Sequence, residues 1–182
     1  MSDPLVVIVS GAPGSGKTTL AGAIAQYMML PHVERDKIVR GLECTSGVRV
    51  DRAVVGIPVY FRQLDSMLND GISFVTDGTL YRGVSEKDIQ EHIISRAKVV
   101  NVHARASNSR ERFYEREMNR TGWPNDWVED HMRHLDKIHP QTVDPLELGV
   151  PVIEVDASGD YDPTVKDIAK IIRQYYSNPK GE

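Results

Sequence analysis

Several kinds of protein are excluded by what this sequence lacks. With one cysteine, Cys44, among 182 residues, the chain can form no internal disulfide, which suits a reducing compartment. None of its apolar runs approaches the ~20 residues that a membrane-spanning helix requires. Residues 1–4 lack the basic region of a signal peptide, so we expect a cytoplasmic location and no membrane partner.

Basic charge is not in excess either. The chain has 22 Lys and Arg against 26 Asp and Glu, a net charge of −4. A protein that grips many phosphates of a long duplex is usually basic overall. Residues 1–62 and 96–120 nevertheless contain more basic than acidic side chains. Together these two segments could form a local basic surface that holds a short strand end.

The sequence does contain alternating strand and helix signals, which predict an α/β protein with a parallel sheet covered on both faces. Its length, with 40% hydrophobic residues, suits a single domain over residues 1–182. Residues 43–56 show no clear periodicity, and we expect a mobile segment there on the substrate side. The predicted strands are 5–9, 32–34, 72–77, 98–103 and 150–156. One helix is predicted after residue 17, a second begins at residue 36 and the last begins at residue 163. Four more are predicted over residues 58–69, 85–94, 107–119 and 127–138.

Residues 11–19, Gly-Ala-Pro-Gly-Ser-Gly-Lys-Thr-Thr, fit the phosphate-binding pattern of Gly, four residues, then Gly-Lys-Ser/Thr. A chance match in a glycine-rich turn is the alternative, but a strand before the motif and a helix after it argue against this. That arrangement aims backbone N–H groups and a helix dipole at one point. Lys17 would bind the β- and γ-phosphates of ATP, and the Thr18 hydroxyl would bind Mg²⁺. The predicted nucleotide-binding residues are Ala12, Pro13, Gly14, Ser15, Gly16, Lys17, Thr18 and Thr19.

Other motifs that accompany a phosphate loop are missing. We find no Asn/Thr-Lys-x-Asp run, which a GTPase would normally use to read its base. An ATP-driven motor usually has an apolar strand that ends in Asp-Glu, whereas Asp77 is followed here by Gly78. A small kinase instead needs a base for the acceptor hydroxyl, a carboxylate after the strand beside the first, and an arginine-bearing lid. Candidates for all three occur, in that order.

The candidate base is Asp36, which follows the second predicted strand. The carboxyl ends of the strands are where open α/β folds bind ligands. There Asp36 could accept a proton from an attacking hydroxyl and hold it in line with the γ-phosphate. The alternative is that Asp36 only caps the helix that it opens.

The candidate carboxylate is Asp77, at the end of an apolar strand. It could orient Mg²⁺ through water or bind the acceptor. The alternative is a turn without function, because Asp-Gly is a common turn pair.

The candidate lid spans about residues 105–130. Arg112, Arg116 and Arg120 are spaced by four, so they share one helical face. This row could close on the triphosphate and stabilise charge in the transition state. A solvated face that mixes these arginines with glutamates is the alternative. Trp123 and Trp127 follow in a turn suited to a hinge, where packing under the lid is favoured over stacking on a base.

These motifs resemble those of the P-loop kinase group that includes the polynucleotide 5′-hydroxyl kinases. The resemblance is carried by residues 11–19, by Arg35-Asp36 and by residues 77–80, Asp-Gly-Thr-Leu. It implies a three-layer P-loop fold with a five-stranded parallel sheet and a helical lid, Mg·ATP as donor, and Asp36 as general base. It also implies Arg116 or Arg120 as the lid arginine.

The same resemblance suggests the substrate side. Arg35, Asp77 and Thr79 are the predicted substrate-binding residues there. The group's arginine for the substrate phosphate lies three residues after the base, where this chain has Val39. Arg40, one residue further on, could take its place.

We therefore expect an ATP-dependent kinase that phosphorylates a hydroxyl, with Lys17, Asp36, Arg116 and Arg120 as catalytic residues. The favoured acceptor is nucleic acid, either a 5′-hydroxyl end or a hydroxymethylated base. The alternative is a small metabolite, nucleoside, antibiotic or nucleotide-sugar, which the acidic balance favours. A non-catalytic nucleotide-binding module would bind nucleotide without transfer.

Overall fold

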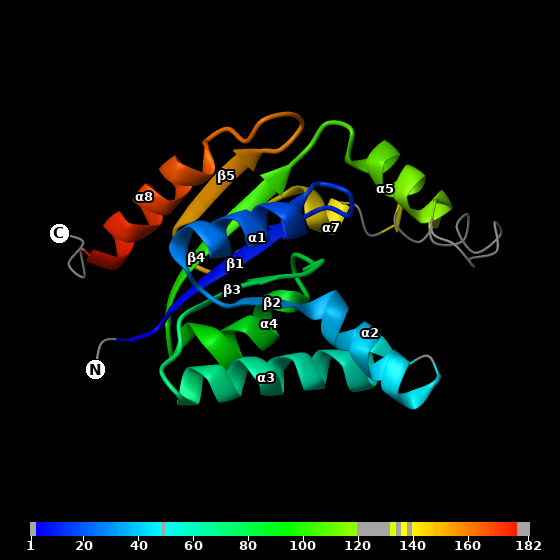
Figure 1. Ribbon diagram of the computed structural model, residues 1–182, viewed down its shortest axis with the longest axis horizontal. Helices are drawn as coiled ribbons and strands as arrows, with labels where there is room; N and C mark the ends of the chain where they lie inside the picture. The colour runs from blue at the N-terminus through cyan, green and yellow to red at the C-terminus, as the bar shows by residue number, and fades with distance from the viewer. Residues whose placement is uncertain (1–2, 49, 120–131, 134–135, 138–139, 178–182) are drawn as a thin grey trace.

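The protein folds around one parallel sheet. The computed structural model describes residues 3–48, 50–119, 132–133, 136–137 and 140–177. Neighbouring strands in the sheet are all parallel, in the order β2-β3-β1-β4-β5 (Figure 1). The strands are β1 (Leu5–Gly11), β2 (His32–Glu34), β3 (Phe74–Asp77), β4 (Lys98–Arg105) and β5 (Val152–Asp156). The predicted α/β class with a five-stranded parallel sheet is confirmed.

The central strand is β1, and its sequence explains its place. All seven of its residues are buried. Val7 and Val9 pack into the hydrophobic core on one face of the sheet, and Val6 and Ile8 pack into the core on the other. Successive side chains of a strand point to opposite faces, so only a continuous apolar run can be covered on both sides.

Helices cover both faces of the sheet. α1 (Lys17–Met28) and α8 (Val165–Ser177) lie on one face. α3 (Ile57–Asn69), α4 (Ser85–Ile89) and the π-helical turn Gln90–Ile94 lie on the other (Figure 1). The result is the three-layer arrangement predicted for a phosphate-loop protein.

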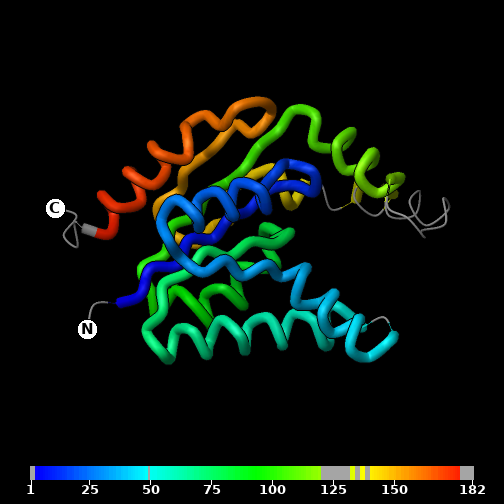
Figure 2. Tube along the Cα trace, viewed as in Figure 1, coloured from blue at the N-terminus to red at the C-terminus, as the bar shows by residue number. Residues whose placement is uncertain are grey.

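The functional edge of the sheet is the one where the strands end. Gly11 of β1 pairs with Ala104 of β4, and Asp77 ends β3, so the phosphate loop lies among the carboxyl ends of the strands. α2 (Arg35–Ser46) and α5 (Ser109–Met118) extend beyond this edge on opposite sides of the loop (Figures 1 and 2). Ligands of open parallel sheets bind at such an edge.

The segment 43–56 is more regular than its sequence suggested. α2 continues through Ser46 and ends at Gly47, whose φ of 69° is left-handed. A π-helical turn, Arg52–Gly56, follows, and the side chain of Asp51 accepts hydrogen bonds from two backbone N–H groups of this turn. Both ends of the segment are therefore helical although the sequence shows no clear periodicity there, because local caps stabilise these turns. The mobility expected of this segment stays a prediction.

The predicted lid lies partly outside the described residues. α5 is its described helix, whereas residues 120–130 and most of the predicted helix 127–138 lie outside. α7 (Pro140–Val143) comes after this region. The lid and the single domain over 1–182 remain predictions. In the part of the chain that the structure describes, no helix combines the length and hydropathy needed to cross a bilayer.

Candidate active site

The phosphate loop has the backbone that its glycines predict. It leaves β1 at Gly11 and enters α1 at Lys17. Gly14 and Gly16 have left-handed φ values of 81° and 84°. A Cβ at Gly14 would lie 1.9 Å from the backbone oxygen of Ser109, so no other residue fits there without movement of α5. The strand, loop and helix needed for a phosphate site are therefore present.

One hydroxyl group of this loop is buried without a partner in the described part of the chain. Ser15 is fully buried, and among the described residues its Oγ makes no hydrogen bond. Ser15 borders a cavity of about 270 Å³ that also touches the end of β4 and the beginning of α5. Buried polar atoms without partners are rare in native proteins. This hydroxyl supports the binding of a polar ligand at the loop.

Lys17 is held with little compensation for its charge. Its side chain is largely buried, and its Nζ lies 3.5 Å from the backbone oxygen of Ala12. Burial lowers the pKa of Lys17 from 10.5 to about 8; Asp36 and Asp77 oppose this, whereas the charges of Arg116 and Arg35 add to it. A buried ammonium group surrounded in this way is stabilised by an anion such as a phosphate.

Thr18 and Asp77 lie together, as a metal-binding pair requires. Thr18 Oγ1 donates a 2.6 Å hydrogen bond to Asp77 Oδ2, and Asp77 is 4% exposed. This places a hydroxyl and a carboxylate, both oxygen donors of the kind that Mg²⁺ prefers, beside the phosphate loop.

The residues present fit a Mg²⁺ that is bound together with a nucleotide. No group of three or more His, Cys, Asp or Glu within the described residues could hold a metal ion. Mg²⁺ commonly takes one or two protein ligands and fills its shell with phosphate oxygens and water. Thr18 and Asp77 match that demand.

Asp36 faces the same site from α2. It lies in the first turn of that helix, but the N-cap residue is Glu34, so the alternative that Asp36 is only a helix cap was wrong. Arg52 Nη1 lies 3.4 Å from Asp36 Oδ1. The charge of Asp36 raises the pKa of Lys17, which puts the carboxylate within electrostatic reach of the ammonium group.

Arg35 is the most unusual charge in the site. Its side chain is half-buried, and it forms no hydrogen bond or ion pair with any described residue. A Cβ on Gly78 would lie 3.2 Å from its Cζ, so the guanidinium lies across the loop that follows β3. Its charge lowers the pKa of both Lys17 and Tyr60. A half-buried guanidinium group with no partner among the described residues suits the binding of an anionic ligand.

Two other predicted substrate residues differ in position. Thr79 is half-buried and directly follows Gly78. Arg40 is exposed and has no polar partner among the described residues, and its contact with a substrate stays a prediction. Val39 is 2% exposed, and a Cβ on Gly56 would lie 2.8 Å from its Cγ2. This position therefore belongs to the core, which explains the absence of an arginine there.

The arginine row of α5 divides into separate roles. Arg112 donates 2.8 Å and 2.6 Å hydrogen bonds to the backbone oxygens of Ala157 and Ser158, so it ties α5 to the loop after β5. The expectation that it faces the triphosphate with the rest of the row was wrong, because these carbonyl groups already bind it. Arg116 lies over the ring of Phe113, 5.0 Å from the centroid, and its charge reaches Lys17. Arg120 lies outside the described residues, as do Trp123 and Trp127.

Sequence reasoning missed His32, the first residue of β2. His32 Nε2 lies 2.8 Å from Asp77 Oδ1, on the opposite carboxylate oxygen from Thr18. A signal for His32 is present in the sequence of β2. His32 and Glu34 lie two apart, so both side chains point to the same face of the sheet.

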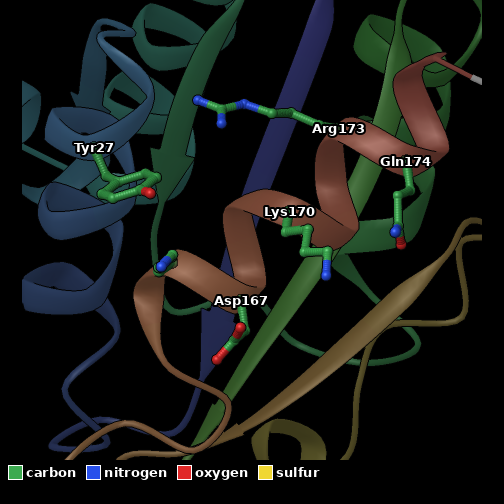
Figure 3. A pocket seen from close by; sticks show the side chains of 6 residues that line it. Tyr27, Asp167, Lys170, Arg173 and Gln174 are labelled. Carbon is green, nitrogen blue, oxygen red and sulfur yellow. The ribbon is translucent and has the colours of Figure 1, made fainter.

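A hollow of about 520 Å³ between α1 and α8 is not part of this site. Figure 3 shows that its side chains do not converge: Lys170 and Gln174 point away from the ring of Tyr27. Arg173 lies over that ring at 5.9 Å from the centroid. The hollow has neither a glycine-rich loop nor the paired carboxylate and hydroxyl of the phosphate-loop site.

Comparison with known proteins agrees with this fold. No family model matches the chain, and no curated protein matches it. A provisionally assigned kinase of Chloroflexus aurantiacus is 23% identical, with a TM-score of 0.77 over 99% of this chain and 100% of that one. A gluconokinase of Sinorhizobium meliloti is 18% identical, with a TM-score of 0.60 over 99% and 100% of the two chains. A shikimate kinase of Acinetobacter baumannii, solved with shikimate, is 19% identical, with a TM-score of 0.55 over 99% and 97%.

These likenesses cover the whole chain rather than the phosphate loop alone. The shared architecture is the five-stranded parallel sheet with helices on both faces. The protein therefore has the fold of the P-loop kinases.

Proposed function

We propose that this protein is an ATP-dependent kinase that phosphorylates a hydroxyl group of a small anionic metabolite. One observation carries the proposal. Lys17 begins α1, Arg35 and Asp36 begin α2, and the charges of Asp36 and Arg35 both alter the pKa of Lys17. A phosphate-binding cation, a candidate base and a second cation that has no partner among the described residues therefore lie within electrostatic reach of one another at the carboxyl edge of the sheet.

The donor side of the site is formed by the phosphate loop. The backbone N–H groups at the start of α1 and the Lys17 ammonium hold the β- and γ-phosphates of ATP. Arg116 adds positive charge where charge moves during transfer. Mg²⁺, bound at Thr18 and Asp77, would neutralise phosphate charge.

The acceptor side is formed by the beginning of α2. Asp36 accepts the proton of the acceptor hydroxyl while the hydroxyl oxygen attacks the γ-phosphorus in line with the leaving ADP. Arg35 holds an anionic group of the acceptor, which orients the hydroxyl toward the donor. In this proposal the protein contributes mainly positioning and electrostatic stabilisation.

A small acceptor is favoured over nucleic acid for three reasons. The net charge is −4, and Val39 occupies a core position where a substrate-phosphate arginine was expected. The fold is also similar to that of a gluconokinase and a shikimate kinase.

A 5′-hydroxyl end or a hydroxymethylated base remains the second candidate acceptor. The Arg35-Asp36 pair and residues 77–80, which resemble the motifs of polynucleotide kinases, favour it.

Transfer from labelled ATP tests these proposals. The wild-type protein is incubated with hydroxy acids, neutral sugars, nucleosides and 5′-hydroxyl oligonucleotides, and the Asp36→Asn variant is assayed beside it. We expect label on a hydroxy acid and a loss of roughly 10²–10⁴-fold in kcat for Asp36→Asn, with ATP binding retained. Label on oligonucleotide alone would favour the second candidate acceptor. Unchanged turnover in Asp36→Asn would refute the assigned base, and nucleotide binding without any transfer would indicate a binding module.

A further inference from the structure

The carboxylate of Asp77 is held from two sides. Its Oδ2 accepts the 2.6 Å hydrogen bond from Thr18, and its Oδ1 lies 2.8 Å from His32 Nε2. Asp77 is 4% exposed, and the side chain of His32 is 16% exposed. A buried carboxylate needs donors on its oxygens, and here each oxygen has one. The plane of this carboxylate is therefore determined by two residues, only one of which belongs to the phosphate loop.

The sheet itself places His32 at this position. β2 pairs with β3 so that His32 lies opposite Val75 and Glu34 lies opposite Asp77. Side chains two apart on neighbouring strands share a face, and Val75 packs in the core beneath α1. The ring also lies near Gly22 of α1, where an added Cβ would be 3.7 Å from its Nδ1. His32 is thus held between two strands and a helix rather than on a loop.

The chemistry of the pair determines where the proton lies. An ionised carboxylate only accepts hydrogen bonds, so Nε2 of His32 carries the hydrogen that Asp77 accepts. Nδ1 lies 3.7 Å from Glu34 Oε1, and Glu34 in turn accepts a 2.5 Å hydrogen bond from Lys37. A row of side chains therefore leads from exposed Lys37 inward to the threonine of the phosphate loop.

We propose that His32 is a positioning residue for the Mg²⁺-bound nucleotide, an inference that rests on the proposed function. By binding Oδ1, His32 keeps Oδ2 of Asp77 directed at the Thr18 hydroxyl. The hydroxyl proton then stays on the Asp77 side, and the oxygen lone pairs of Thr18 remain available for the metal ion. Partners of this outer kind typically contribute 10–100-fold to metal affinity.

Calorimetry of ATP binding, with Mg²⁺ and with EDTA, tests the inference without measuring activity. In His32→Ala we expect ATP affinity to fall roughly tenfold in Mg²⁺ but to stay within about twofold of wild type in EDTA. His32→Gln should recover most of the loss, because its side-chain amide can donate to Oδ1 in place of Nε2. His92→Ala is the matched control, because His92 Nδ1 lies 2.9 Å from Asp65 Oδ2 in a similar pair away from the site. It should leave the effect of Mg²⁺ unchanged.

The possible results separate this inference from the function on which it rests. Equal weakening in Mg²⁺ and EDTA, no weakening at all, or no recovery in His32→Gln would each overturn the positioning role alone. His32→Gln also keeps the test decisive if His32→Ala does not fold. Failure of the wild-type protein to bind ATP under either condition would refute the proposed function, and the inference with it.

Discussion

Replacing Lys17 by methionine should make the nucleotide-free protein more stable and, at the same time, unresponsive to ATP. Burial lowers the pKa of Lys17 from 10.5 to about 8. Each pH unit corresponds to ~1.4 kcal/mol, so the folded state bears a cost of about 3 kcal/mol for keeping this ammonium group charged at pH 7. Methionine has a similar length and no charge, so the variant avoids that cost.

Thermal unfolding without nucleotide measures the gain. For a protein of this size, a change of 1 kcal/mol shifts Tm by roughly 2–4 °C, so Lys17→Met should melt about 6–12 °C higher at pH 7. Lys170→Met, at an exposed position on α8, is the control and should change Tm little. With Mg·ATP at ~100 times its Kd, the wild-type protein should gain about 2.7 kcal/mol, whereas Lys17→Met should gain almost nothing.

The pH dependence supplies a second check. Between pH 8 and 10.5 the unfolded state retains the lysine proton while the folded state releases it, so the unfolded state binds more protons. The free energy of unfolding of the wild-type protein therefore rises with pH across that window. Below pH 8 the folded state bears the full cost of keeping Lys17 charged. The difference in Tm between Lys17→Met and wild type should shrink from pH 8 to pH 10. A variant no more stable than wild type at pH 7, or a difference that does not change with pH, would refute the reasoning.

Two further substitutions test the packing around the site. Gly14→Ala should lower the free energy of unfolding by about 1–3 kcal/mol more than Gly71→Ala. Both glycines have positive φ, but only at Gly14 would the new Cβ meet a backbone oxygen, that of Ser109. Urea denaturation measures the difference, and equal losses in the two variants would contradict this predicted clash. Arg112→Ala should cost about 1–3 kcal/mol because two backbone oxygens of the loop after β5 lose their donor. Arg62→Ala, at an exposed position on α3, is its control in the same titration, and a loss no greater than that of the control would show that the two hydrogen bonds contribute little.

Much of the fold could be predicted because its signals are local. The apolar run of β1 indicates a strand covered on both faces, and the glycines and lysine of residues 11–17 indicate a turn into a helix. The helical ends of residues 43–56 could not be predicted from apolar periodicity. There Asp51 and Gly47 stabilise short helices by capping, without the apolar periodicity on which the prediction relied.

The candidate site was predictable only in part. Thr18 and Asp77 could be paired in advance, because a phosphate loop and a carboxylate after a neighbouring strand meet at one edge of a parallel sheet. The partners of Arg112 could not be predicted, because the carbonyl groups that it binds lie 45 and 46 residues away along the chain. The spacing of four between Arg112 and Arg116 shows that they share one face of a helix, but it does not show what that face contacts.

The amino-acid sequence by itself determined the phosphate loop, the strand that enters it and the helix that leaves it. These depend on residues within a few positions of one another, through backbone angles and hydrogen bonds that close locally. Tertiary structure alone decided the strand order, the contact of His32 with Asp77 and the position of Arg35 against Gly78. Each of these depends on how distant segments pack together, because burial and electrostatic reach are properties of the space around a residue.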